Sequence, residues 1–237
     1  MGSAPAHLLA PGVWRIPVAP ADGINAFVLV GDDGQVTLVD AGMAWAWGRL
    51  TAGLQHAGLG VEDVTGVLVT HAHADHAGNV ARVREVSGAP VWAHGADAAD
   101  LRAGQSPPVD PSLRWHALKA RWGRYPAVAV DETFEDGALL DIAGGLRVVH
   151  TPGHTPGHTS YLHEPTGVLI TGDVIHYWRS KVRIGMRMYC HDLALNERSA
   201  HRLGTLEYDT VAFTHGPHIA RGGRARVQAF LAARGPA

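Results

Sequence analysis

Residues 71–76, with the sequence His-Ala-His-Ala-Asp-His, hold four potential metal ligands in six positions. Imidazole groups and the carboxylate of Asp75 suit a divalent ion such as zinc. Three histidines crowded onto one tight turn would repel one another when protonated, so a bound cation explains the pattern better than a solvated loop does. This segment therefore predicts a metal centre, and other parts of the chain must supply further ligands.

Three later segments contain such ligands. Each begins with an apolar run that reads as a strand, continues to a histidine or aspartate, and is punctuated by glycine or proline. The ligand candidates are His154, Asp173 and His215, and the runs cover residues 146–150, 168–171 and 211–214.

The elements around the first cluster explain how it would be positioned. The β-branched run 66–70 reads as a short buried strand that ends directly before His71. Residues 77–86 follow with three valines on one face, which predicts a helix with Asp75 near its N-cap. The cluster is therefore expected on a strand-to-helix loop at the carboxyl end of a strand, where α/β proteins commonly build sites.

The rest of the pattern predicts an ordered α/β chain, with residues 1–237 forming one domain. The further strands and helices are expected at 13–18, 24–30 and 35–40, and at 43–56, 192–206 and 224–233, respectively.

Composition excludes several classes of protein. Hydrophobic residues make up 46% of the chain and charged residues 18%, as in globular enzymes, and the net charge of -2 argues against nucleic-acid binding. No apolar run approaches the ~18–20 residues of a membrane span, and no secretory signal is visible. The single cysteine, Cys190, excludes an internal disulfide and reads as a structural thiol. We predict a cytoplasmic protein that does not attach to membranes, and nothing in the pattern indicates an oligomeric state.

Four segments, in this order, resemble the metallo-β-lactamase fold hydrolases, particularly their glyoxalase II-like and lactonase-like branches. These segments are residues 70–76, 151–158, 171–173 and 214–216. The resemblance covers nearly the whole chain. It implies a four-layer αββα sandwich of two mixed sheets, with a two-metal site at one edge of the sheets.

The resemblance also implies a complete ligand set of seven residues. One metal would be held by His71, His73 and His154. The other would be held by Asp75, His76 and His215, with Asp173 bridging both. The implied cofactors are two divalent ions. Zinc is the expected metal, and iron and manganese are alternatives.

Two such ions lower the pKa of a shared water, and the bridging hydroxide attacks a carbonyl. We therefore expect a small-molecule hydrolase that cleaves a thioester, lactone or ester, in which Asp75 also orients the nucleophile or moves a proton. Acyl-homoserine lactonases carry a tyrosine three residues after the bridging aspartate. That position is His176 here, and Tyr177 follows it, so either residue is a candidate acid or hydrogen-bond donor.

Departures from the family pattern reduce the number of candidate activities. Antibiotic-hydrolysing metallo-β-lactamases usually carry Cys or Ser where Asp173 stands, and flavodiiron proteins carry Glu at the position of His73, so both activities are disfavoured. The chain ends about twenty residues after His215, too soon for the helical region of glyoxalase II. Two alternatives stay open: a mononuclear iron persulfide dioxygenase, and a two-metal phosphodiesterase or nuclease.

Residues 105–129 depart from the regular order of strands and helices and form a candidate lid insertion. The segment is rich in proline, and between Pro111 and Tyr125 it carries four cations, three aromatics and no acid. It reads either as an amphipathic surface helix or as a lid that selects an anionic or acyl-bearing substrate. Arg114, Lys119 and Arg121 are its candidate contacts. The same hypothesis extends to a second group of cations, Arg179, Lys181 and Arg183.

Overall fold

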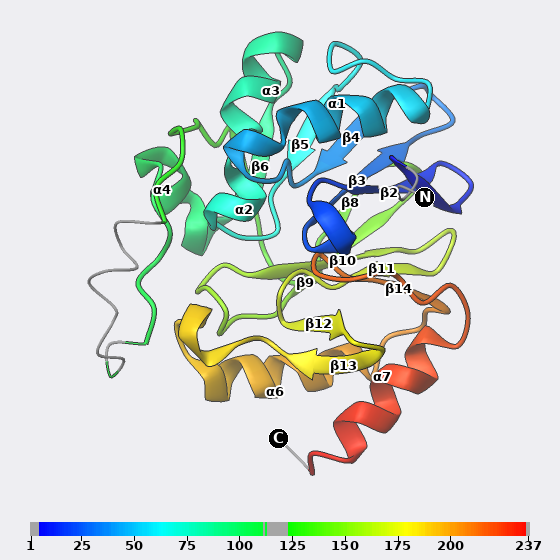
Figure 1. Cartoon of the computed structure of the whole chain (residues 1–237), viewed down its shortest axis with the longest axis vertical. Coiled ribbons are helices and arrows are strands. Elements are labelled where there is room, and N and C mark those ends of the chain that lie inside the picture. The colour runs from blue at the N-terminus through cyan, green and yellow to red at the C-terminus, as the bar shows by residue number, and fades with distance from the viewer. Residues whose placement is uncertain (1–4, 111, 113–122, 236–237) are drawn as a thin grey trace.

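The computed structural model describes residues 5–110, 112 and 123–235 (Figure 1). Two sheets lie face to face, with helices on the outer face of each, so the predicted αββα sandwich is confirmed. Of the basic lid candidates, Arg114, Lys119 and Arg121 lie outside the described residues. No helix in the described ranges combines the length and the apolar character needed to cross a membrane.

The first sheet has seven strands in sequence order. The early strands pair antiparallel, and from β4 onward the pairing is parallel, because helices connect these strands. Its strands are β1 (His7–Ala10), β2 (Val13–Pro17), β3 (Asn25–Val30), β4 (Val36–Val39), β5 (Gly66–Leu68), β6 (Val91–His94) and β7 (Glu132–Phe134).

The second sheet has five strands in the order β14-β11-β10-β9-β8, and a separate hairpin, β12–β13, lies beside it. Only β14 pairs parallel, with β11. These strands are β8 (Leu139–Leu140), β9 (Leu146–His150), β10 (Thr159–His163), β11 (Val168–Ile170), β12 (Ile175–Trp178), β13 (Lys181–Ile184) and β14 (Thr210–Ala212).

Helices cover the outer faces of both sheets (Figure 1). The first four lie on the first sheet and the last two on the second. They are α1 (Trp47–His56), α2 (Ala74–Ala77), α3 (Val80–Ser87), α4 (Gly95–Ala103), α6 (Leu193–Leu203) and α7 (Gly223–Ala232), with 3-10 turns η1 (Pro20–Asp22), η2 (Ala44–Ala46) and η3 (Arg187–Tyr189).

Three apolar cores hold the four layers together. The central core lies between the sheets, where residues such as Phe27 and Tyr161 are fully buried. One outer core joins the first sheet to its helices through Leu50 and Leu101, and the other joins the second sheet to α6 and α7 through Leu203. Burial of such side chains contributes roughly 1.5–3 kcal/mol each.

The helix expected at 77–86 is α3, which begins three residues later, at Val80, and a separate short helix, α2, precedes it, so the predicted start was wrong. The break lies at Gly78, where a Cβ atom would stand 2.5 Å from the carbonyl oxygen of Ala74 and 2.7 Å from that of Gly42. The backbone approaches too closely there for any side chain. Asp75 consequently lies in the first turn of α2, whose N-cap is His73.

Candidate metal centre

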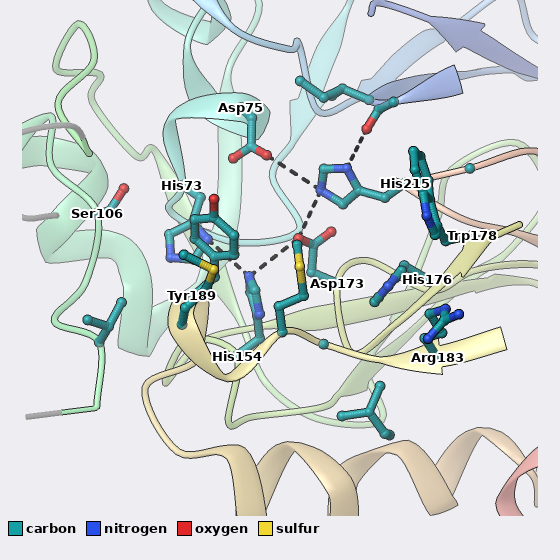
Figure 2. Close-up of a pocket in the computed structure, with 18 of the residues that line it drawn as sticks. His73, Asp75, Ser106, His154, Asp173, His176, Trp178, Arg183, Tyr189 and His215 are labelled. Atoms are coloured by element: carbon teal, nitrogen blue, oxygen red, sulfur yellow. Dashed lines mark hydrogen bonds and ion pairs between the residues drawn. The ribbon is translucent and has the colours of Figure 1, made fainter. Parts of the chain in front are cut away.

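The seven predicted ligand residues meet at one edge of the two sheets (Figure 2). Four come from the loop and short helix after β5, and the others follow β9, β11 and β14. Their potential ligand atoms form three groups, and within each group all atoms lie within 4.8 Å of one another. These groups are His71, His73 and His154; His71, His76 and Asp173; and Asp75, His76 and His215.

The first group brings three ring nitrogens together. His73 Nδ1 lies 3.1 Å from His71 Nε2 and 3.0 Å from His154 Nε2. The Thr70 hydroxyl donates to Asp40 Oδ2 at 2.7 Å, so it accepts from His71 Nδ1 at 3.0 Å and leaves the lone pair of Nε2 facing the group. Burial lowers the pKa of His73 to about 4 and lowers those of His71 and His154 as well. Neutral imidazoles are the form that binds metal.

The second group leaves a buried nitrogen without a hydrogen bond. His76 donates from Nδ1 to Asp40 Oδ2 at 2.8 Å, which leaves a lone pair on Nε2. Nε2 is fully buried and has no hydrogen-bond partner, although carboxylate oxygens of Asp75 and Asp173 lie 3.6 Å and 3.5 Å away. A lone pair that faces two carboxylates is unfavourable unless positive charge lies between them, either a proton on the ring or a metal ion.

The charges around the second and third groups lead to the same conclusion. Burial opposes a charge on His215, but Asp173 and Asp75 outweigh it and raise the pKa of His215 to about 9. The pKa of His76 is raised well above its ordinary value for the same reason. Without a metal, protons supply the positive charge that these carboxylates attract, and a divalent ion would displace those protons. The residues present therefore fit a metal centre.

Asp173 lies between the groups. Its Oδ2 is 3.0 Å from His215 Nε2 and 3.4 Å from His154 Nε2, and its Oδ1 accepts from the Thr214 hydroxyl at 2.6 Å. The backbone N–H of Asp173 donates to His158 Nε2 at 2.7 Å. His158 thus positions the residue that faces both sides of the candidate centre.

Two further buried carboxylates hold the ligand loops in place, and the sequence analysis missed both. Asp40 accepts from the backbone N–H and hydroxyl of Thr70 and from His76. Asp97, on α4, accepts from the backbone N–H groups of Ala72 at 2.9 Å and Gly157 at 2.6 Å, and from the Thr155 hydroxyl at 2.6 Å.

Asp97 therefore joins the first ligand loop to the loop that carries His154. Burial raises the pKa of Asp97, and the hydrogen bonds that it accepts oppose this shift. A sequence signal existed only for Asp40, which stands at the end of an expected strand. Nothing near Asp97 in the sequence indicates its partners, which lie 25 and about 60 positions away.

The two residues proposed to assist at the substrate lie on opposite faces of β12. Successive side chains of a strand alternate in direction. His176 lines the cleft beside the metal centre, and burial lowers its pKa. Tyr177 stacks on Phe213 at a ring separation of 5.4 Å and does not line the cleft. The structure therefore brings His176, and not Tyr177, to the site.

His150 and Cys190, which lie near the ligand loops in the sequence or in the fold, have structural surroundings. His150 stacks on His94 with ring centroids 3.8 Å apart, away from the ligand atoms. Cys190 is buried, and its sulfur lies 3.6 Å from Nδ1 of His154, so the thiol packs against the outer edge of a ligand ring.

A cleft of about 1770 Å³ opens over the metal centre. His73, Asp75, His154, Asp173 and His215 line its base. Residues 105–109 and 123–124, which belong to the described parts of the predicted lid, form one wall together with residues 186–189, and the hairpin β12–β13 forms another. A cleft of this size accommodates a small-molecule substrate.

Comparisons with known proteins identify the family. Residues 19–215 match the family model of the metallo-beta-lactamase superfamily. A probable metallo-hydrolase of Bacillus subtilis, YqgX, is 32% identical over 164 residues, which cover 68% of this chain and 71% of that protein. An uncharacterized protein of Aquifex aeolicus is 27% identical over 168 residues, covering 68% of this chain and 69% of that one.

Solved structures show the same fold. A metallo-beta-lactamase family protein of Thermus thermophilus superposes with a TM-score of 0.73 at 29% identity, covering 96% of this chain and 80% of that one. A metallo-beta-lactamase of Cronobacter sakazakii with a HARLDQ motif gives 0.74 at 23% identity over 97% and 95% of the two chains, a likeness of fold alone. The glyoxalase II-like or lactonase-like branch stays a prediction. The matched residues include the ligand loops, and the chain belongs to the metallo-beta-lactamase superfamily.

Proposed function

We propose that this protein is a metal-dependent hydrolase that cleaves a carbonyl ester-type bond, namely a thioester, lactone or ester. The observation that carries the proposal is the set of three overlapping ligand groups, one of which contains Asp173, with the buried Nε2 of His76 facing two carboxylates. Membership of the superfamily and the similarity to a probable metallo-hydrolase support it.

We propose that two divalent ions occupy these groups and that zinc is the preferred metal. His71, His73 and His154 would hold one ion, Asp75, His76 and His215 the other, and Asp173 would contact both. Such ions, when bound, activate water at neutral pH and polarise a carbonyl. Histidine and aspartate ligands also suit iron and manganese, and availability then decides which metal is bound.

The protein's own groups would orient the reaction. Asp75 is 31% exposed at the base of the cleft, with its Oδ2 3.5 Å from His215 Nε2, so one oxygen can accept a proton from a substrate water. Burial lowers the pKa of His176, which favours the neutral ring. Its ring would donate a hydrogen bond to the oxygen of the substrate that gains charge.

Metal content and substrate range together test this function. Elemental analysis of the purified protein would be paired with assays on an ester, a lactone, a thioester, a β-lactam and a phosphodiester. About two divalent ions per chain with turnover of a carbonyl substrate is the expected result. One iron per chain with oxygen uptake on a persulfide would replace the proposal with a dioxygenase. Turnover of the phosphodiester alone would replace it with a phosphodiesterase.

A further inference from the structure

The exposed apolar side chains of the described residues are concentrated at one place. Most large apolar side chains of this fold are buried, and eight are exposed. Five of those eight line the cleft over the metal centre, and they are Trp45, Trp178, Met186, Met188 and Tyr189. Exposed apolar patches of this kind mark binding sites, because water contact with them is unfavourable.

A second feature of the cleft is a group of cations on the hairpin β12–β13. Arg179, Lys181 and Arg183 all line the cleft. Within residues 5–110, 112 and 123–235, no carboxylate lies within 4.0 Å of their charged groups. The cleft-lining carboxylate outside the ligand group, Glu197, is already paired with Arg234. The hairpin therefore presents positive charge that the described residues do not neutralise.

The hairpin geometry places one of these cations next to the reaction centre. Arg183 is the cross-strand partner of His176, three residues after Asp173. The two-residue turn that fixes this register, Arg179 and Ser180, has positive φ at both positions, as type I′ turns require.

The opposite side of the cleft has a different character. There Arg187 is paired with Asp110 at 3.3 Å, and the backbone N–H of Asp110 donates to the carbonyl of Cys190 at 2.9 Å. These contacts fix the turn carrying Met186 and Tyr189 against the wall formed by residues 105–110. Figure 2 shows Ser106 at the left, Tyr189 next to His73 and His154, and His176 and Arg183 at the right, beyond Asp173.

We propose that this cleft selects a thioester or ester with an apolar acyl chain and an anionic leaving group. The apolar acyl chain lies along the methionine and tyrosine side, and the leaving part carries a carboxylate or phosphate that Arg183 binds, with Lys181 and Arg179 adding to the attraction. The scissile carbonyl lies between the two, over the metal centre. This inference rests on the proposed hydrolase function and names the substrate class of the same site.

The reaction balances as a simple hydrolysis. Water adds its oxygen to the acyl carbon, the carbon–sulfur or carbon–oxygen bond breaks, and the leaving sulfur or oxygen takes the second proton. The products are a fatty acid and an anionic thiol or alcohol, with no oxidant or reductant required.

A matched set of thioesters tests both halves of the inference. Acetyl and octanoyl thioesters would be prepared on N-acetylcysteine, which carries a carboxylate, and on N-acetylcysteamine, which is neutral. A pantetheine and phosphopantetheine pair distinguishes phosphate from carboxylate. We expect kcat/KM to rise at least about tenfold from acetyl to octanoyl and about tenfold from the neutral to the anionic thiol. A preference for acetyl or neutral compounds would overturn the inference.

Variants then assign each preference to its residues. Arg183→Glu should remove the preference for the anionic thiol, mainly through KM, so that the ratio of kcat/KM between the anionic and the neutral thioester falls to about one or below. Met186→Glu should remove the preference for the octanoyl chain. The controls are Arg49→Ala, an exposed cation on α1, and Leu139→Ala, an exposed apolar residue, both outside the cleft. Unchanged ratios in Arg183→Glu would contradict the role of the hairpin.

A binding measurement separates this inference from the proposed function. S-octyl N-acetylcysteine is a thioether that lacks the scissile thioester carbonyl, so its calorimetric binding does not depend on hydrolysis. About tenfold weaker binding to Arg183→Glu than to the native protein supports the cleft assignment even if no thioester is hydrolysed. Equal binding would overturn it even if every thioester is hydrolysed.

Discussion

The cleft has a floor and a rim of opposite character. The floor consists of the loops that carry the seven predicted ligand residues, and the rim consists of the hairpin β12–β13 with residues 186–189. In the floor, most polar atoms are buried and bonded to a fixed partner such as Asp40 or Asp97. In the rim, side chains such as Trp178, 51% exposed, and Arg183 face the solvent-filled cleft.

This difference separates two tasks. A metal centre needs ligands held within a fraction of an ångström, which buried hydrogen bonds provide. Substrate selection needs only a surface of the right charge and polarity, which exposed side chains provide. Changes in the floor should therefore affect metal binding and turnover together, whereas changes in the rim should affect the choice of substrate.

The largest effect is expected from removal of a floor ligand. His71→Ala or Asp173→Ala should lose metal and reduce hydrolysis by at least about a thousandfold, because the water-activating group is lost. Elemental analysis and kcat/KM measure this, and circular dichroism should show an unchanged fold. Full activity in either variant would be incompatible with the assigned centre.

A smaller effect is expected from changing Asp97, which holds two ligand loops of the floor in place but is not itself a predicted ligand. In Asp97→Asn, an NH2 group replaces one of the two carboxylate oxygens that accept from backbone N–H groups. Two donors then face each other, one hydrogen bond is lost, and the two ligand loops are no longer held together. We expect metal affinity to fall about 10–100-fold with a loss of roughly 1–3 kcal/mol in the free energy of unfolding. Competition with a chelator and urea titration measure the two. Asp100→Asn, on the same helix, is the control, and equal behaviour of both variants would argue against the support role.

His176 lies where the floor meets the rim, and we expect it, unlike the adjacent Tyr177, to contribute to catalysis. His176→Ala should lower kcat at least about tenfold with metal content unchanged, because a hydrogen-bond donor to the reacting oxygen is lost. Tyr177→Phe keeps the stacking on Phe213 and should leave kcat unchanged. The opposite result, a loss in Tyr177→Phe alone, would show that the rim strand reorients during turnover.

The smallest effect is expected at the turn of the rim. Ser180 has φ of 59°, a region that glycine adopts without strain. Ser180→Gly should raise the free energy of unfolding by up to about 1 kcal/mol and leave metal content unchanged. Urea denaturation measures this. A drop in bound metal would mean that floor and rim are not independent.

The sequence predicts the floor better than the rim, for a physical reason. Ligand types and strand-forming apolar runs are local signals, so residues 66–71 and 211–215 can be recognised where they stand. The contacts of Asp97 form only after the fold brings Gly157 beside it, and no local pattern records them. The break between α2 and α3 depends on Gly42 approaching Gly78 in the same way.

The rim hairpin was missed as secondary structure for another reason. Its strands carry polar and aromatic side chains on one face, and its turn is Arg179-Ser180 rather than the Asn-Gly or Asp-Gly pair that marks a hairpin in sequence. The cations were noticed as a cluster, yet only the register shows Arg183 beside His176.

The placement of β14 has a consequence for the order of events during synthesis. This strand pairs with β11, and His215 follows it, whereas the first four ligand residues lie about 140 positions earlier. Domains emerge from the ribosome amino end first. The nascent chain therefore displays residues 71–76 long before their partners exist, and the centre is complete only when the last strand has joined its sheet. If the proposed ions bind, their complete ligand sets form only at this last step, and an ion bound earlier would be held by half of its proposed ligands.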